Sequence, residues 1–219
     1  MTTSEDAYWN AFYRERHPDI EDPSSFATYV LPKIAAGANL FELGCGNGRD
    51  ALFFASRDLR VTACDRSKIA IETLQTKPGL DRFTHRPRFL VSDFAELDRN
   101  YQGDPPDVVY SRFTLHAIPA SVASTALGWV RRALRPGGTL LIEARSVEGS
   151  LYGKGEQVER DAFIHDGHYR RFLRMNELTT ELTHLGFTIA EATQSAGVAV
   201  YHDDDPVVIR LAATSPDPE

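Results

Sequence analysis

Apolar and polar positions alternate in blocks along most of the chain. Short hydrophobic runs predict strands near residues 39–43, 60–64, 87–91, 107–111 and 139–144. Between these runs, apolar positions at helical spacing predict helices near residues 48–57, 67–76 and 119–134. Because strands and helices alternate, the pattern predicts an α/β fold whose parallel strands are joined by right-handed crossovers.

The two ends of the chain extend this pattern. Aromatic residues followed by a Pro-Ser-Ser break predict a helical cap at the amino terminus, and a helix near 175–185 with strands near 187–193 and 206–212 completes the sheet. We therefore expect one domain over residues 1–219. Its predicted parts are a helical cap at 1–36, a core at 37–144, a lid at 145–174 and a C-terminal helix and strand pair at 175–219.

The predicted lid follows neither the strand nor the helix period. Residues 145–174 are rich in Gly, Lys, His, Tyr and Arg. A segment of this length without secondary structure is too long for a simple connection in a compact domain. We therefore expect an irregular lid or substrate segment after the fifth strand.

Composition narrows the class of protein. A chain of 219 residues with 42% hydrophobic and 25% charged residues fits one ordinary globular domain. No apolar run approaches the ~20 residues that span a bilayer, and the first residues do not resemble a signal peptide. We expect a cytoplasmic protein that does not contact a membrane, with Cys45 and Cys64 reduced. The formal charge of −7 argues against a broad nucleic-acid surface, so we expect a small-molecule partner. The oligomeric state is left open between a monomer and a homodimer.

The segment from Asn39 to Asp50, NLFELGCGNGRD, concentrates the clearest chemical signals. An apolar run ends in Glu42 and breaks into alternating glycines at positions 44, 46 and 48. Glycine permits positive φ angles and close approach of a ligand to the backbone, and the helix start that follows adds N–H groups and partial positive charge. Asp65, at the end of the next apolar run, could accept both hydroxyls of a ribose. Together these features predict a nucleoside-cofactor site.

Two details favour S-adenosylmethionine over a dinucleotide. The spacing Gly-Cys-Gly-Asn-Gly differs from the G-x-G-x-x-G turn that binds a pyrophosphate. Glu42 would face a pyrophosphate unfavourably, but it suits a ligand that carries an ammonium and a sulfonium. A nicotinamide-dependent oxidoreductase on a similar sheet remains the alternative.

Four motifs in order carry a family resemblance: the glycine turn, Asp65, Ser92-Asp93-Phe94, and Leu134-Arg135-Pro136-Gly137-Gly138. Over roughly residues 38–145 the chain resembles class I S-adenosylmethionine-dependent methyltransferases. The sequence around GCGNGRD is similar to that of the small-molecule branch of this family, which includes tellurite-resistance-type enzymes. The resemblance implies a Rossmann-like, seven-stranded, mostly parallel sheet whose last strand is antiparallel, with helices on both faces. It also implies S-adenosyl-L-methionine as methyl donor and S-adenosyl-L-homocysteine as product.

The resemblance assigns roles near the donor. Glu42 would anchor the methionine ammonium and Asp65 the ribose, while Asp93 would meet the adenine amino group; alternatively Asp93 caps a short helix. The expected cofactor residues are Trp9, Tyr13, Glu42, Gly44, Cys45, Gly46, Asn47, Asp65, Arg66, Asp93, Phe94 and Arg112. Trp9 and Tyr13 lie four residues apart on one helix face, where they would close over the sulfonium or pin the cap to the core.

Two histidines are candidate general bases. His116 follows the fourth strand, and His168 lies in the predicted lid. Either could serve a hydroxyl acceptor, and either could equally be a packed neighbour. A hydroxyl acceptor predicts a loss of rate as the histidine protonates, whereas an oxyanion acceptor predicts little change down to pH 5.

The lid carries the residues expected to bind the acceptor: Tyr169, Arg170, Arg171 and Lys154. Their donors could hold a carboxylate, phosphate or phosphonate. Because adjacent residues of an extended segment point opposite ways, only one of the two arginines should touch the ligand. Alternatively, the arginines pair with Glu156, Glu159 or Asp161.

We expect no metal, since His165, Asp166 and His168 lack a further well-placed ligand. The sequence therefore predicts a methyltransferase that acts on a small polar metabolite, anionic or hydroxylated, with oxygen favoured over nitrogen. A non-catalytic S-adenosylmethionine-binding regulatory subunit is a further alternative. A nucleic-acid or protein methyltransferase is disfavoured, because no Asn/Asp-Pro-Pro-Tyr-like tetrapeptide follows the fourth strand.

Overall fold

The computed structural model describes residues 9–11, 13–14 and 22–216. Seven strands form one sheet in the order β3-β2-β1-β4-β5-β10-β9. Neighbouring strands are parallel in the pairs β1–β2, β2–β3 and β4–β5, whereas β10, the last strand of the chain, runs antiparallel to both β5 and β9. The predicted seven-stranded sheet with an antiparallel last strand is confirmed.

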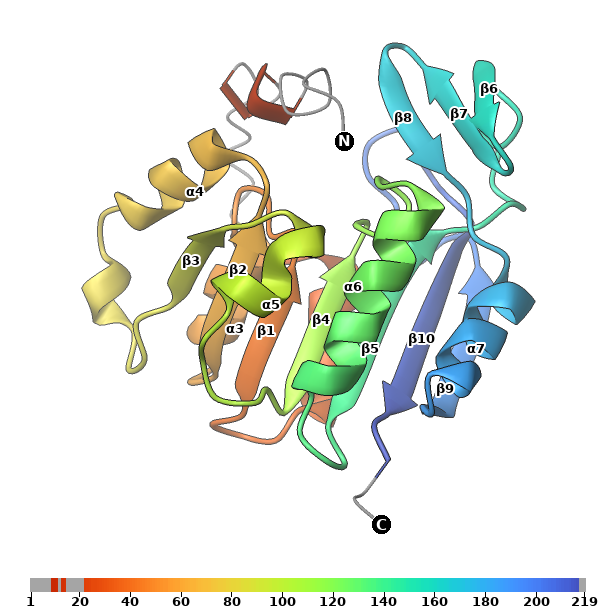
Figure 1. Cartoon of the computed structure of the whole chain (residues 1–219). Coiled ribbons are helices and arrows are strands. Elements are labelled where there is room, and N and C mark those ends of the chain that lie inside the picture. The colour runs from red at the N-terminus through yellow and green to blue at the C-terminus, as the bar shows by residue number, and fades with distance from the viewer. Residues whose placement is uncertain (1–8, 12, 15–21, 217–219) are drawn as a thin grey trace. The chain divides into compact units, whose positions relative to one another are not determined.

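The chain divides into two compact units, Met1–Pro106 and Asp107–Glu219. The first contains β1 (Asn39–Leu43), β2 (Arg60–Asp65) and β3 (Arg88–Val91). Its α-helices are α2 (Ser25–Val30), α3 (Arg49–Ala55), α4 (Lys68–Gln75) and α5 (Leu97–Asn100) (Figure 1). Its 3₁₀ helices are η1 (Leu31–Lys33), η2 (Leu80–Arg82) and η3 (Phe94–Glu96). Apolar residues of β1 and β2 are almost fully buried, since helices pack on these strands.

Serine caps fix two helices of the first unit. Ser24 accepts a hydrogen bond from the N–H of Ala27 at the start of α2, and Ser67 accepts one from the N–H of Ala70 at the start of α4. Ser24 also donates its N–H and its hydroxyl to the carboxylate of Asp50, at 2.7 Å each. Asp50 is buried in the first turn of α3, so this acid ties the start of α2 to the start of α3.

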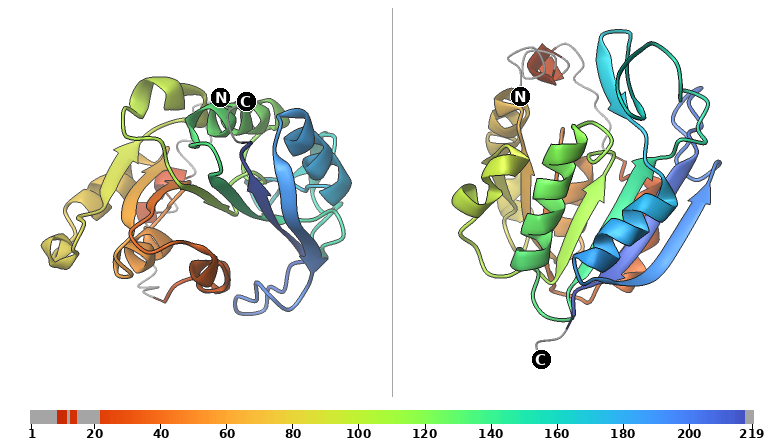
Figure 2. Two further views of the ribbon diagram at one scale, coloured as in Figure 1. Left: turned by 90° about the horizontal axis from the view of Figure 1, so that it is seen from below. Right: turned by 45° about the vertical axis from the view of Figure 1, so that its right-hand side comes forward.

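The second unit contains β4 (Val108–Arg112), β5 (Thr139–Arg145), β9 (Thr188–Ser195) and β10 (Val208–Thr214). Its helices α6 (Ala120–Ala133) and α7 (Met175–His184) lie on the same face of these strands (Figures 1 and 2). The helices are linked by a hydrogen bond from Ser124 Oγ to Glu181 Oε1 (2.6 Å) and by one from Arg131 Nε to the carbonyl of Leu185 (3.0 Å).

Residues 145–174 contain regular structure, so the prediction that this segment is irregular was wrong. Its role as a lid stays a prediction. The strands β6 (Glu156–Glu159), β7 (Ala162–His165) and β8 (His168–Arg171) form a separate antiparallel sheet. The turn between β7 and β8 is Asp166-Gly167, and both residues have positive φ, 52° and 71°. Asp-Gly is a strong signal for a two-residue hairpin turn, and the sequence analysis overlooked it.

Every other predicted strand and helix from residue 39 onward ends within two residues of its observed bounds. The predicted cap is described only in part, because Tyr8 and Phe12 lie outside the described residues. The predicted single-domain organisation stays a prediction. Within the described ranges, no helix combines the length and the apolar character that a membrane span requires.

Candidate functional site

The glycine turn after β1 has the geometry that its sequence predicts. Gly44, Gly46 and Gly48 all have positive φ, at 72°, 55° and 76°. The N–H groups of Gly44 and Cys45 donate to the carbonyl of Cys64 in β2 at 2.8 and 2.9 Å, and Gly48 N–H donates to the carbonyl of Cys45 at 2.9 Å. Because side chains rarely adopt this backbone conformation, the turn depends on its alternating glycines.

Asp65 ends β2 and is tied to the glycine turn. Its Oδ2 accepts a hydrogen bond from Gly46 N–H at 2.9 Å, and its Oδ1 accepts one from Ser67 N–H at 2.8 Å. Burial raises the pKa of the Asp65 carboxyl above its ordinary value, and these backbone hydrogen bonds partly offset the rise. An ionised carboxylate has about four acceptor positions, so two further donors, such as a pair of hydroxyls, can be accommodated.

Buried acids and thiols surround the same turn. Glu42, near the end of β1, is only 4% exposed. Cys45 and Cys64 are buried free thiols, which confirms that they form no disulfide. Burial, and then the negative charges of Asp65 and Glu42, raises the pKa of the Cys45 thiol well above its usual range. Burial raises the pKa of the Cys64 thiol as well, so both cysteines stay protonated and unreactive at neutral pH.

Asp93 caps a short helix, as one of the two interpretations predicted. Its carboxylate accepts a hydrogen bond from Ala95 N–H at 2.9 Å at the start of η3, where Phe94 is buried. The Asp93 carboxylate also lies 3.9 Å from the guanidinium of Arg66, the residue that follows β2. A contact with adenine stays a proposal, and the capping bond holds Asp93 in place for it.

The described part of the N-terminal helix reaches the glycine turn. The hydroxyl of Tyr13 lies against Gly46, where a β-carbon would collide with it. Trp9 stacks on Tyr13 with ring centroids 6.0 Å apart, and Asn10 Oδ1 accepts a hydrogen bond from Ser67 Oγ at 2.8 Å. Tyr13 thus lies at the turn, and Trp9 packs behind it on the same helix. Asn47, also predicted here, accepts a weak bond from Arg49 N–H at 3.4 Å.

In the second unit, a buried glutamate joins three strands. Glu143 of β5 has no exposed surface; its Oε1 accepts from Arg112 Nε of β4 at 2.9 Å and its Oε2 from Arg210 Nε of β10 at 2.7 Å. Arg112 Nε thus pairs with Glu143, and the predicted role of Arg112 at the cofactor stays a prediction. Sequence reasoning missed Glu143, although a charged residue inside the apolar run of β5 was a visible signal.

Phe113, directly after β4, has φ of 56°, a strained backbone conformation for an aromatic residue. The guanidinium carbons of Arg112 and Arg145 lie 4.2 and 5.3 Å from the centroid of its ring. His116 meets the same ring edge-on at 5.0 Å. Two cations and an imidazole therefore gather around one aromatic side chain.

Both predicted bases are held as neutral imidazoles. His116 is buried, and its Nδ1 accepts a hydrogen bond from Arg145 N–H at 3.3 Å. Burial, and then the charge of Arg145, lowers the pKa of His116 well below its ordinary value. Burial and the charges of Arg170 and Arg145 lower the pKa of His168 to about 3. Neither imidazole carries a proton charge near pH 7.

The two lid arginines lie in different environments. Arg171 donates its N–H to the carbonyl of His116 at 2.7 Å, and its guanidinium donates to the carbonyls of Leu115 and Ile118 at 2.9 and 3.3 Å. Arg170 donates to the carbonyl of His165 at 3.3 Å and acts electrostatically on both His116 and His168. Glu159 and Asp161, two of the acids that the alternative interpretation named, act electrostatically on Arg171.

Other lid residues have structural partners. Asp161 accepts two hydrogen bonds from the Arg174 guanidinium at 2.9 Å and one from Tyr152 Oη at 2.6 Å, a network that sequence reasoning missed. Lys154 lies exposed in the turn before β6, and Tyr169 is half-buried on β8. Roles for both in acceptor binding stay proposals.

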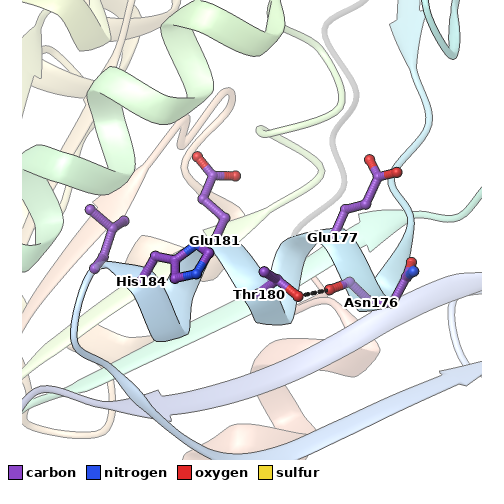
Figure 3. A pocket seen from close by; sticks show the side chains of 6 residues that line it. Asn176, Glu177, Thr180, Glu181 and His184 are labelled. Atoms are coloured by element: carbon purple, nitrogen blue, oxygen red, sulfur yellow. Dashed lines mark hydrogen bonds between the residues drawn. The ribbon is translucent and has the colours of Figure 1, made fainter.

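A shallow pocket runs along α7. Figure 3 shows Glu177 and Glu181 projecting on one side of the helix, with Asn176, Thr180 and His184 beside them. None of these residues belongs to the predicted site. In the part of the chain that the structure describes, no group of three or more His, Cys, Asp or Glu side chains is placed to hold a metal ion.

Comparison with known proteins adds three findings. The family model described as "Methyltransferase domain" matches residues 40–138. The chain is 27% identical over 194 residues to the tRNA N(3)-methylcytidine methyltransferase Mettl2 of Drosophila melanogaster, covering 81% of this chain and 57% of that protein. It is 32% identical over 114 residues to the 27-O-demethylrifamycin SV methyltransferase of Amycolatopsis mediterranei, covering 52% of this chain and 40% of that protein. The chain thus spans about half the length of the curated relatives it matches.

A solved structure shares the fold over nearly the whole chain. It is the 1,6-didemethyltoxoflavin-N1-methyltransferase of Burkholderia thailandensis, with bound 1,6-didemethyltoxoflavin and S-adenosylhomocysteine. The TM-score is 0.70 at 18% identity, covering 98% of this chain and 88% of that one. At this identity the likeness establishes a common fold.

Proposed function

We propose that this chain, whose residues 40–138 match the family model described as a methyltransferase domain, is a class I, S-adenosylmethionine-dependent methyltransferase. The chain transfers the methyl group of S-adenosylmethionine to an oxygen, or alternatively a nitrogen, of a small polar acceptor. The proposal rests on one observation: the glycine turn after β1, whose Gly46 N–H is bonded to the buried carboxylate of Asp65.

The residues around the turn fit this donor by their chemistry. Glu42 and Asp65 place two buried carboxylates near the ends of adjacent parallel strands. Such a pair suits a ligand with an ammonium, a sulfonium and ribose hydroxyls, and would repel a pyrophosphate. Asp65 would hold the ribose, Glu42 the ammonium, and Asp93 the adenine amino group. Trp9 and Tyr13 would cover the donor from the N-terminal helix.

S-adenosylmethionine, when bound, supplies a methyl group that is already activated by a positively charged sulfur. The chain's own task is alignment of the acceptor, which can remove about 7–11 kcal/mol of barrier. Neither predicted histidine is well suited to act as a general base. Nδ1 of His116 is occupied by Arg145 N–H, so the neutral ring carries its proton on Nε2, and His168, with a pKa of about 3, is a weak base. An acceptor that is already an anion needs no base and is favoured.

RNA is the rival acceptor. The Drosophila relative is named for methylation of tRNA cytidine, whereas the Amycolatopsis and Burkholderia proteins are named for small molecules. The formal charge of −7 supports a small acceptor, because protein surfaces that bind RNA are normally basic. The narrower likeness to tellurite-resistance-type enzymes, a cytoplasmic location, the monomeric or homodimeric state and the exclusion of nucleic acid stay predictions.

Calorimetric titration tests the donor assignment. We expect S-adenosylhomocysteine to bind and NADH not to bind, and Asp65→Asn to weaken binding at least tenfold. Asp203→Asn, at an exposed acid, serves as the control and should bind as wild type does. Urea denaturation checks that each variant is folded. A folded Asp65→Asn variant with wild-type affinity, or a wild-type chain that binds NADH instead, would contradict the proposal.

Product formation tests the acceptor. The chain is incubated with S-adenosylmethionine and a panel of phosphorylated, carboxylated and hydroxylated metabolites, with tRNA as a separate arm, and S-adenosylhomocysteine is quantified. Turnover with a small acceptor is the expected result. Turnover with tRNA alone would replace the small-molecule assignment with the rival one.

A further inference from the structure

A cavity of about 160 Å³ lies in the second unit, between α6, α7 and the segment that leads from β8 to α7. Its apolar wall consists of Leu115, Ala120, Ala123, Leu127, Phe172 and Leu178. Engineered apolar cavities of about 150 Å³ accommodate a benzene ring, so this cavity has room for the hydrocarbon part of a small ligand.

Four of the charged residues that line the cavity form ion pairs with one another. Arg174 donates two hydrogen bonds to the carboxylate of Asp161, both at 2.9 Å, and Arg160 donates one to Glu177 at 2.6 Å. Arg160 and Asp161 form the turn between β6 and β7, whereas Arg174 and Glu177 lie at the start of α7. These pairs fix one wall of the cavity and balance their own charges, so they do not select the charge of a ligand.

Arg171 and Glu181 line the same cavity, and neither forms an ion pair with a residue that the structure describes. A guanidinium has five N–H donors, and Arg171 uses two of them on the carbonyls of Leu115 and Ile118. Three of the five donors are therefore left for a ligand. Glu181 accepts a hydrogen bond from Ser124 Oγ through Oε1, so its Oε2 has room for a donor. Figure 3 shows that Glu181 projects from the same side of α7 as Glu177, which also lines the cavity.

Arg171 and Glu181 present opposite charges to one cavity without pairing directly. Burial lowers the pKa of the Arg171 guanidinium, and Glu181 is among the acids whose charge partly offsets this. Of the other carboxylates that act on Arg171, Asp161 is bound to Arg174 and Glu159 is exposed on β6. A partly buried charge gains free energy when a ligand brings it an opposite charge. A ligand with a single charge would be attracted by one of the two residues and repelled by the other, whereas a zwitterion would satisfy both.

We propose that this cavity binds a small zwitterion, an α-amino acid with a short apolar side chain. Its carboxylate binds the remaining donors of Arg171, its ammonium binds Glu181, and its side chain packs against the apolar wall. The carbonyls that hold Arg171 and the hydroxyl of Ser124 that holds Glu181 orient both charged groups before the ligand arrives, which lowers the entropy cost of binding. The inference goes beyond the proposed methyl transfer and does not depend on it, since every residue of the cavity belongs to the second unit.

Calorimetric titration of the full chain with L-valine and L-leucine tests the site. Two analogues of leucine each lack one charge: 4-methylpentanoate has no ammonium, and 3-methylbutylamine has no carboxylate. We expect an amino acid to bind wild type and both analogues to bind about tenfold more weakly or worse. Glu181→Gln should weaken leucine binding about tenfold but leave the binding of 4-methylpentanoate unchanged, whereas Arg171→Gln should weaken both. The matched controls are Glu156→Gln and Arg132→Gln, at exposed positions of β6 and α6, and both should bind leucine as wild type does.

The location of the ligand is tested by Ala123→Leu, which fills the cavity from α6 and leaves both charged residues in place. This variant should lose leucine binding, and an unchanged affinity in the folded variant would place the ligand elsewhere and overturn the site. Failure of both amino acids to bind wild type overturns it too, as does equal affinity for leucine and 4-methylpentanoate. Urea denaturation checks that each variant is folded. S-adenosylhomocysteine is titrated into the same variants and should bind all of them equally, so the amino-acid site and the donor assignment can fail separately.

Discussion

Acidification should destabilise the folded chain through His168. Burial, and then the charges of Arg170 and Arg145, lowers the pKa of this imidazole from 6.5 to about 3. The unfolded chain therefore takes up a proton near pH 6.5 that the folded chain does not accept until about pH 3. Because the pKa of His168 is lower in the folded chain, His168 does not affect the free energy of unfolding above pH 6.5. It lowers this free energy progressively as the pH falls from 6.5 towards 3.

The magnitude at pH 5 follows from this difference. pH 5 lies about 1.5 pH units below the ordinary histidine value, and each unit corresponds to about 1.4 kcal/mol. His168 alone should therefore lower the free energy of unfolding by about 2 kcal/mol between pH 7.5 and pH 5. His116 acts in the same direction, because its pKa is also lowered.

Urea denaturation at pH 7.5 and pH 5 measures the effect. We compare wild type with His168→Gln, which cannot titrate, and with His184→Gln, at an exposed position of α7, as the control. His168→Gln should lose about 2 kcal/mol less than wild type between the two pH values, and His184→Gln should behave as wild type. If wild type and His168→Gln lose the same stability, the imidazole of His168 is not held neutral in the folded chain.

Two further predictions concern buried groups. Glu143→Gln removes the negative charge that Arg112 and Arg210 share, and should lower the free energy of unfolding by about 3–5 kcal/mol. The control Glu148→Gln, at an exposed position, should change the free energy of unfolding little. Equal urea midpoints for the two variants would show that the ion pairs are dispensable. Gly48→Ala should lower the free energy of unfolding by about 1–3 kcal/mol more than Gly37→Ala does in the same assay. Both glycines have positive φ, but of the two only Gly48 would place a β-carbon 2.5 Å from the side chain of Leu74. Equal losses of stability in the two variants would refute this contact.

The donor side of the site was predictable because its signals are local. The three glycines at positions 44, 46 and 48 permit the positive φ that a tight turn after a strand requires. Asp65 ends an apolar run that follows this turn, which is the position of a ribose-binding acid in nucleotide-binding α/β folds. Strand bounds were equally accessible, since buried parallel strands appear as continuous apolar runs. The β6–β8 sheet was not found, although Asp166-Gly167 marks its hairpin, because composition was given more weight than turn chemistry.

The acceptor side was less accessible, because its chemistry depends on partners distant in sequence. Arg112 is held by Glu143, 31 residues away, and His116 receives the N–H of Arg145, 29 residues away. Alternation along an extended segment predicted that the two lid arginines point apart, but only the carbonyls around Arg171 and the histidines near Arg170 show how their surroundings differ. A lone histidine after the fourth strand reads as a base in the sequence. Placed beside three arginines, it becomes a neutral donor, and the same arginines that suppress its basicity make an anionic acceptor the better chemical match.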